Sequence, residues 1–273
     1  MKLGICSYSF HRAFEAGTMD VFAFIDLCAG LGCTQLDPLG HHILPALDDP
    51  DYRDRLQESA RNVGLPFGCI AVDGADVYEP EPDQRRASRE RAYGWLDFLA
   101  IIGARQVRID AGNPAEMSDE VFAILVEGYD DLVQRGRARG LEILVENHRG
   151  ALREVEAVVR LLEAVPGLGL LFDTNNWAAG KQHLGWEMTA PYARATHIKT
   201  FRFEESGDDP TVDLHRAIHL LQSAGYGGAW GIESTPRELD EVEAVRKTIA
   251  LLRRALNAED SAAAKSEGAG SEH

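Results

Sequence analysis

The sequence lacks the features that mark membrane and secreted proteins. No uninterrupted apolar run approaches the roughly 18 residues that a membrane span needs. The N-terminal residues lead directly into a strand-like pattern, without a charged leader followed by an apolar stretch, so we find no signal peptide. We therefore expect a cytoplasmic protein that does not bind membranes.

Positive charge is also scarce. The 273 residues include 28 Lys and Arg against 44 Asp and Glu, which gives a formal net charge of −16. A surface of this sign repels phosphate backbones, so nucleic acid is not expected as a partner. Gly-rich phosphate loops, dinucleotide fingerprints and nucleophile elbows are absent as well, so the sequence implies neither a nucleotide nor a phosphorylated sugar as ligand, and it leaves open whether the substrate is phosphorylated.

Cysteine is rare and shows no pairing pattern. The four cysteines lie in or beside apolar runs and form no Cys-x-x-Cys motif. This arrangement indicates buried free thiols in a reducing compartment rather than disulfides. They are Cys6, Cys28, Cys33 and Cys69.

What the sequence does contain is a regular alternation of short apolar runs with longer amphipathic stretches. Such alternation predicts a parallel sheet with helical crossovers. Eight repeats predict an α/β protein with a single (β/α)8 TIM barrel over residues 1–256. Residues 257–273 are small, polar and aperiodic, and we expect a disordered C-terminal tail. The predicted strands are 2–8, 33–37, 65–72, 104–110, 141–146, 168–173, 194–199 and 228–233.

The predicted helices fall between these strands, and suitable residues stand at their ends. Ser118 and Asp213 are placed to cap helix starts, and a glycine follows most helical stretches, where a left-handed turn is wanted. Residues 174–192 are weakly patterned and predict a loop with a short helix. The clearest helices are 19–31, 52–63, 84–102, 118–139, 151–164, 213–224 and 237–256.

Four side chains able to bind a metal stand at the ends of four successive predicted strands. Each alone has an ordinary explanation as a salt bridge, a helix cap or a packed core histidine. Because a parallel barrel brings these strand ends to one rim, a shared metal explains all four together. Two Glu, one Asp and one His suit a hard or borderline divalent cation with open positions. The four residues are Glu146, Asp173, His197 and Glu233.

The same segments carry a family resemblance that covers nearly the whole chain. They resemble the last four strands of the xylose-isomerase-like TIM-barrel superfamily, which includes sugar isomerases and epimerases, inosose dehydratases, hydroxypyruvate isomerases and endonuclease IV. The order and spacing of the motifs are more specific than any one of them. The segments are Leu144–His148, Leu171–Asn175, Thr196–Lys199 and Trp230–Glu233, together with Lys2–Phe10 and Gly225–Gly228.

The resemblance implies a cofactor and a set of catalytic residues. Glu146, Asp173, His197 and Glu233 would bind one divalent cation, Mn²⁺, Mg²⁺, Co²⁺ or Zn²⁺. Glu146 and Glu233 would also face each other across the substrate as proton-transfer groups.

Two further residues match functional positions of the superfamily. Lys199 matches a lysine common in the dehydratase-like and isomerase-like branches. His148 matches a frequent substrate-contacting histidine, and either residue could act as an acid or polarise a carbonyl.

Candidate substrate contacts surround these positions. Arg108 could hold a substrate oxygen or carboxylate, but pairing with a metal-ligand carboxylate is an equal alternative. Tyr8 and Trp177 could form pocket walls, because the C–H faces of sugars stack on aromatic rings. Asn176 stands where ketose 3-epimerases tend to carry a histidine, and we predict that it contacts the substrate.

Differences from the superfamily limit which of its functional properties can be transferred to this chain. Besides Asn176, the chain has Leu152 and Phe203 where ketose 3-epimerases tend to carry a glutamate and an arginine. The substrate specificity of ketose 3-epimerases should therefore not be assigned to this chain. Endonuclease IV needs a cluster of histidines for three zinc ions, which this chain lacks.

We therefore predict a metal-dependent isomerase or epimerase of a sugar or polyol ketone, acting by proton transfer through a metal-stabilised enediolate. A lyase on the same fold, such as a keto-inositol or keto-sugar dehydratase, is the first alternative. A non-catalytic metal-containing binding barrel is an alternative of another class. The particular substrate, the native metal and the formation of a homo-oligomer stay open at this point.

Overall fold

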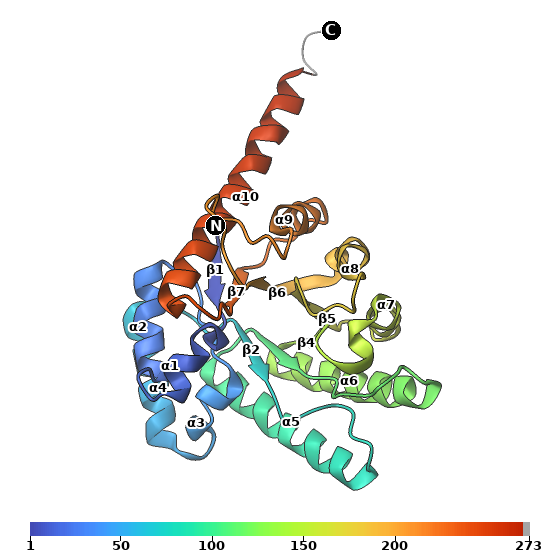
Figure 1. Ribbon diagram of the computed structural model, residues 1–273. Helices are drawn as coiled ribbons and strands as arrows, with labels where there is room; N and C mark the ends of the chain where they lie inside the picture. The colour runs from blue at the N-terminus through green and yellow to red at the C-terminus, as the bar shows by residue number, and fades with distance from the viewer. Residues whose placement is uncertain (270–273) are drawn as a thin grey trace.

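The computed structural model describes residues 1–269 as an α/β barrel in which helices surround a parallel sheet (Figure 1). The sheet has seven strands in the order β1-β7-β6-β5-β4-β3-β2, and every neighbouring pair is parallel. The strands are β1 (Leu3–Ile5), β2 (Cys69–Val72), β3 (Gln106–Ile109), β4 (Glu142–Glu146), β5 (Gly169–Asp173), β6 (Ala193–Thr200) and β7 (Trp230–Ser234).

The eighth strand position is filled by a segment too short to count as a strand. The predicted strand 33–37 is reduced to two isolated parallel bridges, one from Asp37 to Cys6 and one from Leu36 to Phe67. These bridges link β1 to the chain entering β2, so they close the sheet. Pro38 follows at once and has no N–H with which to continue a ladder, which explains why the strand ends there. The predicted TIM-barrel fold is confirmed.

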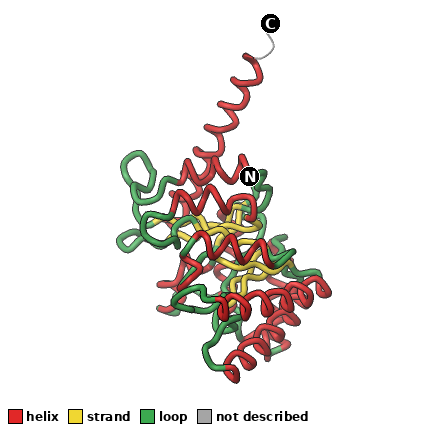
Figure 2. The backbone as a smooth tube through the Cα atoms, turned by 90° about the vertical axis from the view of Figure 1, so that its right-hand side faces the viewer, coloured by secondary structure: helices red, strands yellow, loops and turns green. Residues whose placement is uncertain are grey.

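The helices lie outside the strands, as a view from the side also shows (Figure 2). Ser118 and Asp213 accept backbone hydrogen bonds at the starts of α6 and α9, as predicted. The α-helices are α1 (His11–Glu15), α2 (Val21–Leu31), α3 (Pro45–Asp48), α4 (Pro50–Val63), α5 (Pro82–Ile102), α6 (Asp119–Arg139), α7 (Val155–Ala164), α8 (Gln182–Thr189), α9 (Leu214–Ser223) and α10 (Glu241–Ala269). Short 3-10 helices are η1 (Ser7–Phe10), η2 (Gly40–His42), η3 (Gly150–Arg153) and η4 (Ala190–Tyr192).

The last helix differs from the predicted C-terminal boundary. α10 runs through residue 256 and continues to Ala269, extending away from the barrel (Figure 1). Residues 257–269 include five Ala and two Glu, which are good helix formers and need no hydrophobic pattern to favour a helix. Their backbone is therefore helical here, and the assignment of 257–273 to a disordered tail stays a prediction. Residues 270–273 lie outside the described residues.

The core lies between the strands and the helices that cover them. Strand residues are buried along nearly their whole length, as expected when both faces of a parallel sheet are covered. Inside the barrel a smaller apolar cluster is separate from this core and contains Cys69, Leu144, Leu171 and Ala195. Within residues 1–269, no helix combines the length and the apolar character that a membrane span requires.

Candidate metal centre

The candidate ligands occupy the inward-facing positions directly above this small apolar cluster. Side chains that are two residues apart on a strand point to the same side of the sheet. Glu146 follows Leu144 by two residues on β4, and Asp173 follows Leu171 by two on β5. His197 follows Ala195 in the same way on β6. The period of the strands therefore places the polar residues in one layer at the carboxyl ends of the strands, where TIM-barrel enzymes have their active sites.

The four predicted ligands converge in the structure. One ligand atom from each of Glu146, Asp173, His197 and Glu233 lies within 4.8 Å of the other three, and all four residues are buried. The Nδ1 atom of His197 is at the centre of the group. It lies 2.6 Å from Glu233 Oε2, 3.2 Å from Glu146 Oε1 and 4.0 Å from Asp173 Oδ2.

The donor atoms fit a divalent cation. Glu146 Oε2 and Asp173 Oδ2 are buried, and neither accepts a hydrogen bond of acceptable geometry from residues 1–269. Arg108 Nε and Lys199 Nζ are each 3.0 Å from one of these oxygens and balance part of their charge. Buried carboxylate oxygens are rarely left without partners. A cation held by three carboxylates and one imidazole would satisfy them.

The electrostatics of the site show competition for a small number of positive charges. Burial raises the pKa of Asp173 to about 6, with Lys199 opposing the rise and the neighbouring glutamates adding to it. Burial also tends to raise the pKa of Glu233, but Lys199 and His197 outweigh it and bring the pKa down to about 2. Burial tends to lower the pKa of His197, yet the surrounding acids, Glu233 first, raise it well above its ordinary value. Without a metal, a proton on His197 therefore compensates these acids, and a cation must displace it.

Asp173 is held in place by its neighbours in the chain and by Asn147. Its Oδ1 accepts hydrogen bonds from the N–H groups of Asn175 and Asn176, at 2.7 and 3.0 Å. Asn147 forms two hydrogen bonds of 3.0 Å with the backbone of Asp173, donating to its carbonyl and accepting from its N–H. These contacts leave Asp173 Oδ2 free to face the site, and they tie the end of β4 to the end of β5.

Lys199 and Asn176 together link the three acidic ligands. The ammonium group of Lys199 is 3.0 Å from Asp173 Oδ2 and 3.5 Å from Glu233 Oε1. It also donates to Asn176 Oδ1 at 3.1 Å, and Asn176 in turn donates to Glu146 Oε1 at 3.4 Å. Asn176 therefore binds protein groups at the edge of the site, and its role as a substrate contact stays a prediction.

Arg108 pairs with a predicted metal ligand. It is 3% exposed, and its guanidinium lies 3.0 Å from Glu146 Oε2 and 2.7 Å from Asp73 Oδ1. Burial tends to raise the pKa of Glu146, but Arg108, followed by His197 and His148, outweighs it and holds the pKa well below its ordinary value. Of the two predicted alternatives for Arg108, the structure shows the pairing with a ligand carboxylate. The substrate contact stays a prediction.

His148 is oriented by a buried acid that the sequence analysis did not single out. Its Nδ1 is 2.7 Å from Asp110 Oδ2, and Arg149 donates to the same oxygen at 2.8 Å. Burial tends to raise the pKa of Asp110, yet these partners, His148 first, lower it to about 2. Asp110 therefore carries a negative charge and holds both side chains at the edge of the site.

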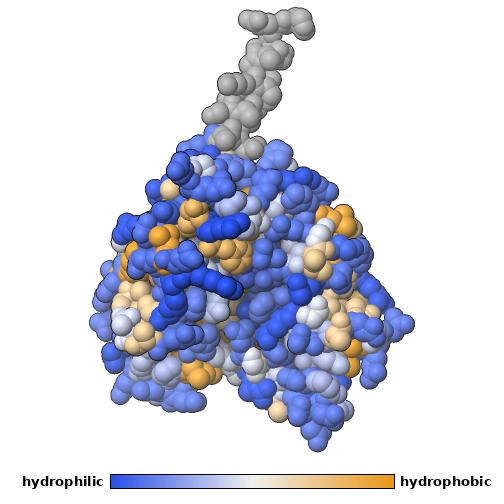
Figure 3. Space-filling model, in the orientation of Figure 1, coloured by the Kyte–Doolittle hydropathy of each residue, from blue (hydrophilic) through white to orange (hydrophobic). Residues whose placement is uncertain are grey.

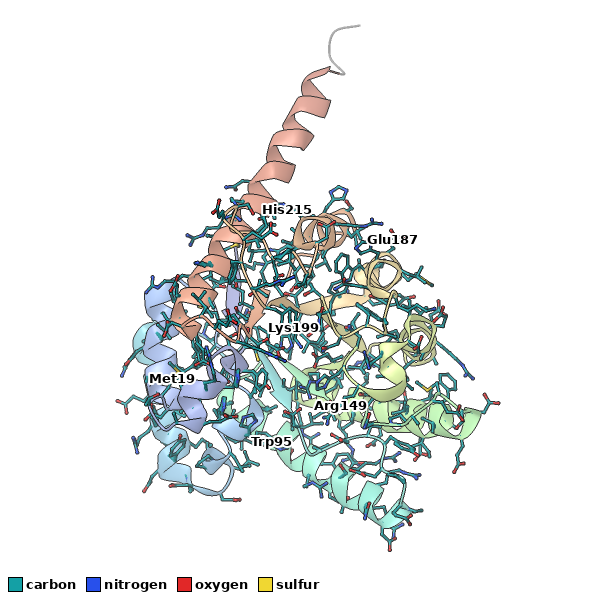
Figure 4. The ribbon with its side chains drawn as sticks, viewed as in Figure 1. Met19, Trp95, Arg149, Glu187, Lys199 and His215 are labelled. Atoms are coloured by element: carbon teal, nitrogen blue, oxygen red, sulfur yellow. The ribbon has the colours of Figure 1, made fainter. Side chains whose placement is uncertain are left out.

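A cavity of about 390 Å³ opens above the candidate ligands. This volume suits a small-molecule ligand. In Figure 4, Lys199 lies near the middle of the barrel face, with Arg149 closer to the centre than Glu187 or His215. The middle of this face is largely hydrophilic (Figure 3). The lining residues are Cys6, Tyr8, Leu39, Asp73, Arg108, Glu146, His148, Arg149, His197, Lys199 and Glu233.

The two predicted aromatic walls have different positions. Tyr8 is 41% exposed, lines the cavity and stacks on His11 with the ring centroids 4.7 Å apart. Trp177 is 4% exposed and belongs to the hydrophobic core, where its ring packs against Gly185 of α8. The prediction of Trp177 as a pocket wall is therefore not supported by its position. The loop after β5 turns this large apolar ring inward, where burial is more favourable than exposure at the rim.

Sequence reasoning missed several residues that shape the site. Asn147 follows a predicted strand and Asp110 ends another, but neither belongs to a metal-ligand pattern that would single it out. Cys6 was predicted only as a buried thiol, although it too follows a strand, β1, and lines the cavity. The sequence offered no signal for this, because the predicted strand 2–8 contains Cys6, whereas β1 ends at Ile5.

Comparisons with known proteins give the same fold. No curated protein matches the sequence. Among solved structures, a D-psicose 3-epimerase in the presence of D-fructose is 16% identical, with a TM-score of 0.74 over 94% of this chain and 99% of that chain. The probable 3-DHS dehydratase AsbF from Bacillus anthracis is 13% identical, with a TM-score of 0.73 over 92% and 99%. An IOLI protein with a binding zinc atom is 15% identical, with a TM-score of 0.76 over 94% and 96%.

At these identities the structural likeness shows the fold alone. The family match is independent of it and covers most of the barrel. Residues 25–255 match the family described as xylose isomerase-like TIM barrel, and the chain therefore belongs to this family.

Proposed function

We propose that the protein is a metal-dependent isomerase or epimerase that transfers a proton next to the carbonyl of a sugar or polyol ketone. One observation carries the proposal. Two buried glutamates, Glu146 on β4 and Glu233 on β7, approach the same nitrogen of His197 from different strands, at 3.2 and 2.6 Å, in the wall of one cavity. This arrangement offers two proton-transfer groups beside one binding position.

The need for a cation follows from the acidity of the substrate. A carbon acid beside a ketone is too weak for an unaided carboxylate at neutral pH. A divalent cation bound by Glu146, Asp173, His197 and Glu233 would stabilise the negative charge that develops on the substrate oxygens.

Different residues of the chain then carry out the separate steps of proton transfer. Glu146 removes a proton from one face of the substrate. Glu233 returns one to the opposite face, which gives an epimer, or to the neighbouring carbon, which gives an isomer. Lys199, held between Asp173 and Glu233 and lining the cavity, donates a hydrogen bond to the carbonyl oxygen.

Structural neighbours agree with this range of reactions. The names of two of them describe an epimerase and a probable dehydratase, and a third holds zinc. We take the native cation to be Mn²⁺, Mg²⁺, Co²⁺ or Zn²⁺ and the substrate to be a small-molecule sugar or polyol. The cytoplasmic location and the homo-oligomer stay predictions.

A lyase is the second candidate, and the position of His148 favours it. The ring lines the cavity and is fixed through Nδ1 by Asp110, so its other nitrogen is available at the pocket. A histidine placed in this way can protonate a departing hydroxyl. Loss of water from the same proton-abstraction step would make the protein a keto-sugar or keto-inositol dehydratase.

The test is hydrogen exchange in heavy water with added Mn²⁺ and a panel of ketoses and keto-inositols. Deuterium at a carbon next to the carbonyl, without loss of mass, supports the isomerase or epimerase, whereas a product lighter by one water supports the lyase. We expect Glu146→Gln to lower the exchange rate by about 10²–10⁴-fold, while the exposed Glu58→Gln on α4 serves as the control.

Two outcomes would contradict the proposal. Unchanged exchange in metal-loaded Glu146→Gln would remove Glu146 as the base. Tight metal binding without exchange on any substrate of the panel would favour the non-catalytic binding barrel.

A further inference from the structure

A cysteine adjoins the candidate metal centre at the end of β1, a strand that supplies none of the four predicted ligands. Cys6 follows β1, and its N–H donates to Ile232 O at 2.8 Å, which places it beside Glu233 across the β1–β7 ladder. It is 2% exposed and lines the cavity. Its thiol is therefore inside the site and shielded from bulk water.

The thiol belongs to a second group of metal-capable atoms. Cys6, His197 and Glu233 each offer one atom that lies within 4.8 Å of the other two, and all three residues are buried. His197 and Glu233 also belong to the oxygen-rich set of four. Two overlapping donor sets therefore share one imidazole and one carboxylate.

A second observation, besides the cysteine, indicates a bound metal at this site. Two buried oxygens of the oxygen-rich set, Glu146 Oε2 and Asp173 Oδ2, accept no hydrogen bond from residues 1–269. Arg108 and Lys199 each lie 3.0 Å from one of them but form no well-aligned hydrogen bond with it, which favours a cation at this position independently of the cysteine. Among the same residues, Cys28, Cys33 and Cys69 are in no group of three metal-capable side chains.

Donor chemistry separates the ions that the two sets prefer. Thiolate and imidazole ligands suit zinc and cobalt, whereas carboxylates suit magnesium and manganese. Three protein ligands with a fourth position open to water or substrate are the usual arrangement of catalytic zinc. The set of Cys6, His197 and Glu233 has this composition.

We propose that Cys6 is a metal ligand for zinc or cobalt, bound together with His197 and Glu233, whereas manganese or magnesium is held by the oxygen-rich set. This inference rests on the metal centre of the proposed function, and it specifies which donor atoms bind which ion there. The Cys6 thiol gives its proton to solvent when the metal binds, as metal-bound cysteines do.

Cobalt provides a direct spectroscopic test. Sulfur bound to Co²⁺ gives a charge-transfer band in the near ultraviolet that oxygen and nitrogen ligands do not give. We expect this band in the cobalt-loaded wild-type protein and in Cys69→Ser, whose thiol lies lower in the barrel interior. We expect no band in Cys6→Ser. A wild-type spectrum without the band, or a band that persists in Cys6→Ser, would overturn the proposal.

Metal competition gives a second readout. Cys6→Ser should lower the affinity for Zn²⁺, measured against a chromogenic chelator, by at least about tenfold, because losing even an outer-sphere partner of a metal ligand costs that much. The affinity for Mn²⁺ should fall less than this. Equal losses for both ions would mean that Cys6 only supports the site, and would contradict the proposal.

One measurement needs no variant and remains decisive if Cys6→Ser does not fold. X-ray absorption of the zinc-loaded wild-type protein should show a sulfur neighbour at about 2.3 Å. Zinc surrounded only by oxygen and nitrogen would overturn the proposal. Failure of the proposed function appears separately, as absent hydrogen exchange in the manganese-loaded wild-type protein whatever the cobalt or zinc spectrum shows.

Discussion

At the scale of single residues, Asp37 shows that the polar character of the barrel continues below the metal centre. It is 6% exposed, and its Oδ1 accepts hydrogen bonds of 2.8 Å from the N–H of Cys69 and from Gln35 Nε2. Gly4 and Gly68 make room for it, because a Cβ at either position would overlap its carboxylate. Burial raises the pKa of Asp37 to about 6, with Cys69 and Gln35 opposing the rise.

This raised pKa predicts a measurable pH dependence of stability. The folded protein holds the Asp37 proton up to about pH 6, whereas the ordinary carboxyl pKa is 3.8. The stabilising contribution of this proton is therefore present below pH 3.8 and is lost as the pH rises through about 6. Two pKa units correspond to about 3 kcal/mol. We expect Asp37→Asn to gain stability relative to wild type by up to about that amount between pH 4 and pH 7.

Urea denaturation at several pH values measures this difference directly. The exposed Asp54→Asn on α4 is the control, and its curve should run parallel to that of the wild-type protein. If the Asp37→Asn curve is parallel as well, the buried carboxyl is not the group that titrates.

At the scale of secondary-structure elements, β6 and β7 meet at a point where only glycine fits. The Gly231 N–H donates to Thr196 Oγ1 at 2.9 Å, and a Cβ at Gly231 would overlap the carbonyl oxygen of Thr196. Thr196 directly precedes His197, and Gly231 stands two residues before Glu233. The close approach of the two strands therefore sets the separation of two candidate ligands.

A single methyl group should disturb this contact. We expect Gly231→Ala to lower the free energy of unfolding by about 1–3 kcal/mol, since the obstacle is backbone and cannot rotate away. Gly227→Ala, where a Cβ has open space, is the matched control and should change stability by less than about 0.5 kcal/mol. Thermal or chemical denaturation of both variants makes the comparison. Equal changes in the free energy of unfolding for the two variants would show that a Cβ at the β6–β7 contact is not specifically destabilising.

At the scale of the whole molecule, the metal centre ties together strands from half of the barrel. Glu146, Asp173, His197 and Glu233 lie on β4, β5, β6 and β7, and three of them are buried acids that repel one another. Arg108, Lys199 and a proton on His197 balance these acids when no metal is bound. A divalent cation would bind only the folded arrangement, so its binding free energy should stabilise the entire barrel.

Addition of the preferred ion should therefore raise the unfolding temperature. At a free concentration one hundred times Kd the gain is about 2.7 kcal/mol, which corresponds to roughly 5–10 °C for a chain of this size. Differential scanning calorimetry with Mn²⁺ or Mg²⁺, the ions assigned to the set that contains Asp173, compared with excess chelator, measures it. Asp173→Asn should reduce the shift, while Asp54→Asn should retain it. An equal shift in both variants would argue that the ion binds elsewhere.

Much of the architecture and the candidate ligand set follow from the sequence alone. The βα alternation, the ends of strands β4 to β7 and the helix caps at Ser118 and Asp213 are local patterns with local causes, and the structure reproduces them. The convergence of the four ligands needed one general rule in addition, that parallel barrels gather the carboxyl ends of their strands.

Only the tertiary structure decided what surrounds those ligands. Asn147 ties β4 to β5, Asp110 holds His148, and Cys6 reaches the site through the pairing of β1 with β7. Trp177 turns into the core instead of lining the cavity. These positions depend on strand register and on how loops fold back over helices. Such contacts join residues far apart in the chain, and no local periodicity records them.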